Sequence, residues 1–166
     1  MVPLIVLVVV TLLARVAGQF GAAPLREWAA VTRIGLAVMF CFTAAAHFSS
    51  MRGDMVRMVP PVIPNPEFMV TFTGICEILG AIGLLVPRTR RVAAVAMVLL
   101  LVALLPANIY AALSGVTLRG APPTPLIPRV ALQVLFVALV WWSGARAPRE
   151  RAAHEATKSS VGRTGA

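Results

Sequence analysis

Glu77 is the residue of this sequence that is hardest to explain as part of an ordinary apolar segment. It lies about ten residues into the run Phe68 to Val86, which carries no other charged side chain. An ionised carboxylate at the centre of a membrane helix costs about 2.5–3.5 kcal/mol on insertion scales. Such a residue normally faces the interior of a helix bundle, where it can hold a ligand or pass a proton.

Other polar residues interrupt three further apolar runs at a similar depth. His47 closes the second run, Asn108 lies in the fourth with Tyr110 close by, and Gln133 lies near the start of the fifth. With Glu77, they all fall between the expected bilayer midplane and the same membrane surface. We therefore expect one polar pocket that opens to that side, with Glu77 at its floor and His47 near its mouth.

The sequence leaves two interpretations of this cluster open. The side chains could form a ligand pocket, in which amide, imidazole and carboxyl groups bind an amphipathic molecule and a proton moves between Glu77 and His47. They could instead bond one another and fix the register of the helices. Interhelical polar bonds in membranes contribute only about 0.6 kcal/mol on average, which is little against the cost of burying Glu77.

The elements that must position these residues are apolar runs long enough, or nearly so, for about 20 helical residues to cross a bilayer. Apolar side chains make up 59% of the 166 residues and charged ones only 13%, whereas soluble domains carry roughly 25% charged residues. The sequence thus predicts an all-α integral membrane protein with five spans: Met1 to Ala17, Trp28 to Phe48, Phe68 to Val86, Val92 to Leu113 and Ile127 to Ala145.

The first run has an alternative interpretation as a cleaved signal peptide. A signal peptide places basic residues before its apolar core, but here the first basic residue is Arg15, which follows the core. That order favours a retained helix whose N-terminus lies outside.

The basic residues predict the orientation of the bundle. With the N-terminus outside, the external segments hold four of the 15 Lys and Arg residues (Arg52, Arg57, Arg119 and Arg129) and the cytoplasmic segments hold the other 11. This excess on the inside is the usual bias of membrane proteins, so we expect the C-terminus in the cytoplasm. The net charge of +9 is divided among short clusters and forms no continuous basic face, which argues against a nucleic-acid partner.

Three regions follow from these runs. Residues 1–26 form an N-terminal transmembrane helix and basic linker, residues 27–146 form a four-helix membrane domain, and residues 147–166 form a polar tail expected to be disordered. The external segment 49–67 contains four prolines, so it cannot be one continuous helix. Within it, Met51, Met55 and Met58 recur at near-helical spacing, which predicts a short turn packed on the bundle.

Several residues are better explained by packing than by chemistry. Gly74, Gly80 and Gly83 allow close approach of neighbouring membrane helices. Cys41 and Cys76 are expected to be small buried side chains, although a disulfide between the two neighbouring spans stays open. Trp141 and Trp142 are typical of interfacial anchors.

The familiar catalytic patterns are missing from the sequence. It contains no phosphate-binding glycine loop, no GxSxG, no HExxH, no CxxC and no His/Cys cluster with metal-ligand spacing. We therefore identify no catalytic residue and expect no metal site. Whether the protein is an enzyme stays open.

A resemblance to a known family rests on a series of short motifs. The chain carries Ala46-His47-Phe48, then Met58-Val59-Pro60-Pro61, Thr73-Gly74-Ile75-Cys76-Glu77, Gly83-Leu84-Leu85-Val86-Pro87 with Arg90-Arg91, Pro106-Ala107-Asn108, and Arg129 with Gln133. In this order and spacing they resemble the DoxX-like membrane proteins, over roughly Trp28 to Trp142. The resemblance implies a DoxX-like four-helix bundle, here with an added N-terminal helix.

The resemblance also implies a functional setting. Archaeal members look like subunits of a thiosulfate:quinone oxidoreductase, and actinobacterial relatives are linked to membrane redox complexes. By this resemblance His47, Glu77, Asn108 and Gln133 occupy recurring polar positions. We expect a membrane subunit or accessory of a redox system with a quinone-like ligand, no cofactor evident in the chain itself, and either redox partner subunits or further copies of itself as partners. The alternative is a non-enzymatic lipid-binding or scaffold protein.

The expected location is the plasma (inner) membrane of a bacterium. Lys158 is the single lysine beside many arginines, and alanine and valine are abundant. This usage is typical of bacteria with GC-rich genomes. The protein would be a multi-pass component of that membrane.

Overall fold

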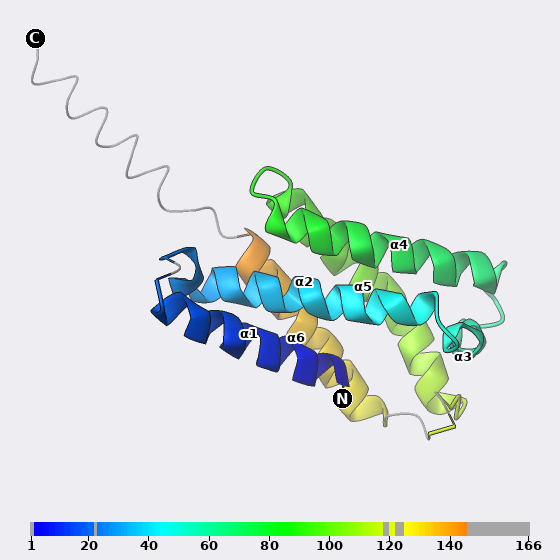
Figure 1. Cartoon of the computed structure of the whole chain (residues 1–166). Coiled ribbons are helices and arrows are strands. Elements are labelled where there is room, and N and C mark those ends of the chain that lie inside the picture. The colour runs from blue at the N-terminus through cyan, green and yellow to red at the C-terminus, as the bar shows by residue number, and fades with distance from the viewer. Residues whose placement is uncertain (1, 22, 118–119, 122–124, 146–166) are drawn as a thin grey trace, which may run out of the picture.

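The computed structural model describes residues 2–21, 23–117, 120–121 and 125–145. The expected tail, 147–166, lies outside these residues. The described part is helical: α1 (Val2–Gln19), the 3-10 turn η1 (Ala23–Arg26), α2 (Trp28–His47), α3 (Arg52–Met58), α4 (Pro66–Leu85), α5 (Arg90–Leu113) and α6 (Leu126–Ala145) (Figure 1).

Five of these helices are long and apolar enough to cross a membrane, and they coincide with the five predicted runs. They indicate a multi-pass membrane protein. The short α3 is the turn predicted from the methionine spacing. The boundaries differ from the prediction by up to two residues. Helix α4, for example, begins two residues early because Pro66 occupies its first turn, where a proline loses no helical hydrogen bond.

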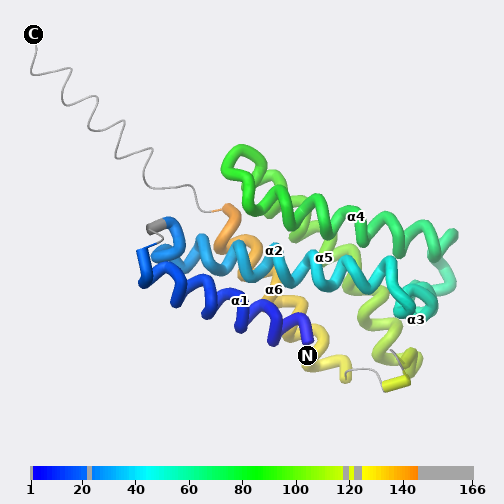
Figure 2. Tube along the Cα trace, in the orientation of Figure 1, coloured from blue at the N-terminus to red at the C-terminus, as the bar shows by residue number. Residues whose placement is uncertain are grey.

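The main body is a bundle in which α2 packs on α4, α4 on α5, α5 on α6, and α6 back on α2. Helix α1 packs along the outside of α2 (Figures 1 and 2). Gly35 permits this approach, because a Cβ there would come within 2.9 Å of the Leu7 carbonyl oxygen. The core contains buried side chains from every long helix, including Leu7, Leu36, Leu84, Met97 and Val140.

The two ends of the bundle differ in charge. We call the end formed by Gln19, Trp28, Leu85, Arg90 and Ala145 the arginine end. Among the described residues six arginines lie toward it and three toward the opposite end. The buried Arg33 donates a 2.7 Å hydrogen bond to the Ser143 carbonyl and so ties α2 to α6 there.

Close packing of α4 on its neighbours confirms the role predicted for its glycines. A Cβ at Gly83 would lie 2.7 Å from that of Ala93, and one at Gly80 would overlap Met97. At Gly74 a Cβ would lie 2.8 Å from the Cβ of His47. These contacts hold α4 tightly against α5 and α2.

The expectation for the cysteines was wrong for Cys41, which is exposed on α2. Cys76 is half-buried, and both thiols are free. A membrane helix carries apolar side chains on the face toward lipid as well as on the face toward the core, so an apolar run does not distinguish the two.

Unequal helix lengths open a space at the end opposite the arginines. Helix α2 stops at His47, which packs against Gly74, so the eight residues of α4 before Gly74 extend past the end of α2. The short α3 takes the place that a longer α2 would fill. Helix α5 diverges from α4 toward this end (Figure 1).

Candidate functional site

One wall of the space is built by α2 and α4 around Glu77 and His47. Both residues are buried, at 6% and 4% exposure. The Nδ1 of His47 lies 2.7 Å from the Val70 carbonyl oxygen, which can only accept a hydrogen bond, so Nδ1 carries a proton. The other ring nitrogen, Nε2, lies 3.8 Å from Oε1 of Glu77.

Thr43 joins the second carboxyl oxygen to the backbone of α2. Its hydroxyl lies 2.8 Å from Oε2 of Glu77 and 3.0 Å from the Phe40 carbonyl. A hydroxyl has one proton, so two arrangements satisfy this geometry. Thr43 donates to an ionised Glu77, or a protonated Glu77 donates to Thr43 while Thr43 donates to Phe40. The cluster can therefore hold or release a proton without moving its heavy atoms.

Thr43 and Thr73 were not predicted as site residues. Thr73 lies 3.4 Å from Nδ1 of His47 and donates to the Met69 carbonyl. Each threonine stands four residues before the titratable group on its own helix, Thr43 before His47 and Thr73 before Glu77. Residues at this spacing share a helix face, and that spacing is the signal that could have found them.

The facing wall comes from α5 and α6. Asn108 donates from Nδ2 to Oε1 of Gln133 at 3.0 Å, and Arg129 donates from a terminal guanidinium nitrogen to Oδ1 of Asn108 at 3.2 Å. Gln133 donates in turn to the Leu101 carbonyl. Pro106 has no N–H group and leaves the carbonyl four residues before it without a helical donor. The Leu101 carbonyl directly precedes that one. The Gln133 side chain of α6 therefore adds a hydrogen bond to α5 where the helical hydrogen bonding is weakened.

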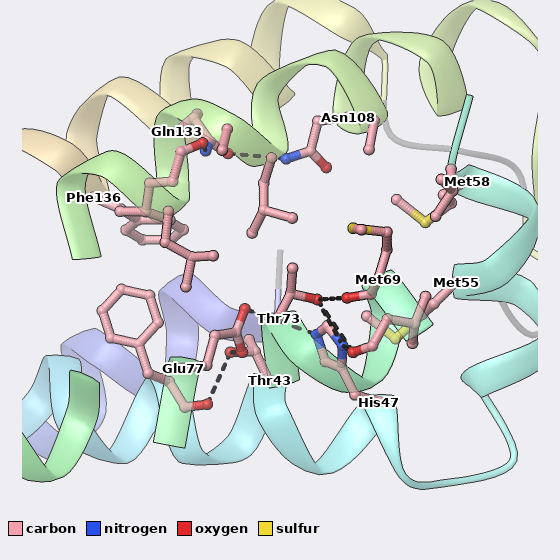
Figure 3. Close-up of a pocket in the computed structure, with 18 of the residues that line it drawn as sticks. Thr43, His47, Met55, Met58, Met69, Thr73, Glu77, Asn108, Gln133 and Phe136 are labelled. Carbon is pink, nitrogen blue, oxygen red and sulfur yellow. Dashed lines mark hydrogen bonds and ion pairs between the residues drawn. The ribbon is translucent and has the colours of Figure 1, made fainter. Parts of the chain in front are cut away.

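The two walls enclose a cavity of about 430 Å³. Figure 3 shows Glu77, Thr43 and His47 on one side of it and Asn108 and Gln133 on the other. Most of the remaining lining is apolar, and thioethers gather at one end. These further lining residues include Met39, Phe40, Met55, Met58, Ile63, Met69, Leu100, Leu104, Leu132 and Phe136.

Four of the five predicted pocket residues line this one cavity: His47, Glu77, Asn108 and Gln133. Tyr110 is half-buried two residues beyond Asn108 and is not among the lining residues. His47 was expected near the mouth, but it lies beside Glu77. The reason is that α4 extends past the end of α2, so the last turn of α2 lies beside the middle of α4.

Arg129 was noted in the sequence but not predicted as a pocket residue. It lies in the first turn of α6, whereas hydropathy alone assigned it to the external loop. The structure directs it into the wall through Asn108. Within the described residues, no group of three His, Cys, Asp or Glu side chains is placed to share a metal ion.

Comparisons with known proteins add a family but no described activity. No curated protein and no solved structure matches the chain. A family described as "Domain of unknown function (DUF8561)" matches residues 36–144, which begin inside α2 and end inside α6. This stretch is more than half of the chain and holds both walls of the cavity. The chain therefore belongs to the DUF8561 family.

Proposed function

We propose that the protein binds a quinone-like or other amphipathic molecule in the cavity between α2, α4, α5 and α6, as a membrane subunit or accessory of a redox system. The observation that carries this proposal is the pair of polar walls facing each other across an otherwise apolar cavity of about 430 Å³. That volume is in the range of small-molecule sites.

The polar groups suit a molecule with a hydrogen-bonding head and an apolar body. Glu77 and His47 supply one titratable pair, and Asn108, Gln133 and Arg129 supply an amide and guanidinium wall. A carboxyl and an imidazole can move a proton but cannot store electrons, so redox chemistry would come from a cofactor or a partner subunit. The redox part of the proposal is supported by the resemblance to DoxX-like proteins.

The proposed setting follows from charge. The arginine end would face the cytoplasm and the cavity end would face outward, because basic residues favour the inner side. We place the protein in the plasma membrane of a bacterium, as the use of arginine over lysine and the many alanines and valines suggested. A ligand would then reach the cavity from the outer leaflet or from the external face.

A second function is favoured by the bonds within each wall. Thr43 with Glu77, and Asn108 with Gln133, already satisfy one another. A non-enzymatic lipid-binding or scaffold protein would need no more than this. The discriminating residue is Glu77, whose burial a scaffold does not require.

The test is native mass spectrometry of the protein extracted gently from its own membrane, comparing wild type with Glu77→Gln. Glu67→Gln is the matched control, because Glu67 is exposed in the first turn of α4 and does not line the cavity. We expect one bound mass of quinone or similar size per chain in wild type and control, and its loss in Glu77→Gln. Equal retention in all three proteins, or bare protein throughout, would favour the scaffold.

A further inference from the structure

The guanidinium of Arg129 is a positive charge without a matching carboxylate in the described part of the chain. The ion pairs found there join Asp54 to Arg57 and His47 to Glu77. Arg129 bonds only to the neutral amide oxygen of Asn108. Its Nε is buried and has no hydrogen-bond partner in the structure. Arg129 as a whole is half-buried. A buried donor without an acceptor is costly, and an anion beside this guanidinium would supply one.

The hydrogen bonds of this wall run in one direction. Arg129 donates to Asn108, Asn108 donates to Gln133, and Gln133 donates to the carbonyl of Leu101. The side-chain oxygens of Asn108 and Gln133 each already accept a bond. What the wall offers an occupant is therefore mainly N–H groups, four of them on Arg129, and the occupant must supply acceptors.

Apolar surface continues from this donor group toward the middle of the bundle. From Arg129 to Phe136 along α6 is seven residues, or about 10 Å at the helical rise. Leu132 and Phe136 line the cavity on this path, facing Leu100 and Leu104 of α5. Figure 3 shows Glu77 near Phe136, and Asn108, the partner of Arg129, farther toward the end where Met58 lies. An anion bound at Arg129 would therefore be kept away from the carboxylate.

We infer that the ligand is an anionic amphiphile whose carboxylate or phosphate binds Arg129 and Asn108 while its hydrocarbon chain lies along Leu132 and Phe136. This rests on the proposed function and specifies the class of molecule that the cavity takes. A carboxylate or phosphate provides the acceptors that the wall lacks, and a guanidinium binds such groups through paired hydrogen bonds. The same chemistry could come from a free fatty acid or from an anionic phospholipid.

The test compares two probes of equal chain length, oleate and oleyl alcohol, on the full chain purified and delipidated in a neutral detergent. Equilibrium binding is measured for wild type, Arg129→Gln, Arg129→Lys and Arg57→Gln. Arg57 lies at the same end of the bundle, is exposed, and does not line the cavity, so its variant removes an equal charge elsewhere. Thermal unfolding of each variant confirms that it is folded.

We expect wild type to bind oleate at least about tenfold more tightly than the alcohol, the effect of one charged hydrogen bond. Arg129→Gln should abolish this preference, while Arg129→Lys and Arg57→Gln should largely keep it. Competition by phosphatidylglycerol that depends on Arg129 would identify a membrane lipid as the source, and its absence a fatty acid. Either result supports the inference.

Two outcomes would overturn the anionic ligand in different ways. Equal binding of oleate and the alcohol by wild type, or a preference that survives in Arg129→Gln, would remove the role of the charge and leave an amphiphile cavity standing. Binding of neither probe by wild type would overturn the anionic amphiphile outright, and the native mass spectrum of wild type would then decide the proposed function separately. If Arg129→Gln does not fold, the wild-type preference and its fate in Arg129→Lys decide the matter.

Discussion

At the scale of single residues, the two walls of the cavity differ in how their hydrogen-bond donors and acceptors are matched. Thr43 has one proton for two acceptors, and His47 has committed Nδ1 to Val70. One proton can therefore be placed on Glu77 or on Nε2 of His47 with little movement. In the facing wall the amides of Asn108 and Gln133 form a chain that ends on a backbone carbonyl. The two walls thus have different chemistry, one titratable and one fixed.

Gln133→Leu should destabilise the protein by about 0.6–1.7 kcal/mol, the range found for interhelical hydrogen bonds in membranes. The substitution removes the donor to Leu101 and the acceptor for Asn108 at a buried position. Reversible unfolding in mixed micelles measures the change. Gln19→Leu, at an exposed position on α1, should shift stability by less than about 0.5 kcal/mol. Equal stability of both variants and wild type would show that the chain of amides contributes nothing to folding.

At the scale of helices, the cavity results from tight packing at one end and divergence at the other. Gly83 and Ala93 bring α4 and α5 together near the turn at Pro87. Toward the other end α5 carries Pro106 and moves away from α4. Helix α3 then covers the gap with Met55 and Met58, whose flexible side chains adapt to different occupants. The tight contact between α4 and α5 at one end therefore fixes how far the two helices separate at the cavity end.

Gly83→Ala should cost about 1–3 kcal/mol, as overpacking of a close contact does. Its new Cβ would lie 2.7 Å from the Cβ of Ala93, which has no rotamer through which to move away. Gly53→Ala is the control, because a Cβ there meets nothing within 4 Å and alanine favours a helix. Thermal unfolding of the two variants in one detergent compares them. A Gly83→Ala protein as stable as the control would mean that α4 and α5 can separate freely.

At the scale of the whole molecule, five helices give the bundle two ends of unlike charge, with the cavity near the less basic one. An excess of arginine on one side orients a multi-pass protein during insertion. The same distribution leaves Arg129 as one of few cations at the cavity end of the described chain. The proposed orientation and the proposed anionic ligand therefore depend on the same placement of charge.

The orientation predicts which positions a membrane-impermeant maleimide reaches in intact cells. In a background with Cys41→Ala and Cys76→Ala, Gly53→Cys should be labelled from outside. Arg88→Cys should be labelled only after the membrane is permeabilised. Both positions are exposed in the structure, so protection would reflect the membrane rather than packing. The reverse pattern would invert the proposed topology and place the cavity toward the cytoplasm.

The five long helices and four of the residues that line the cavity could be predicted from the sequence. Hydrocarbon thickness sets the length of an apolar run, so the spans could be located to within about two residues, as at Pro66. Polar groups at depth are costly, which singled out Glu77, Asn108 and Gln133 without any knowledge of their neighbours.

The rotation of each helix and its extent beside the next helix became known from the folded structure alone. Both faces of a membrane helix are apolar, so no periodicity showed that Cys41 is exposed. Nor did any pattern show that α4 is offset along α2 so that His47 lies 3.8 Å from Glu77. Arg129 reads as a residue of the external loop until α5 is placed beside α6 and Asn108 meets it. The rotation and the axial offset of neighbouring helices depend on contacts between segments far apart in the sequence. Local sequence patterns therefore do not predict them.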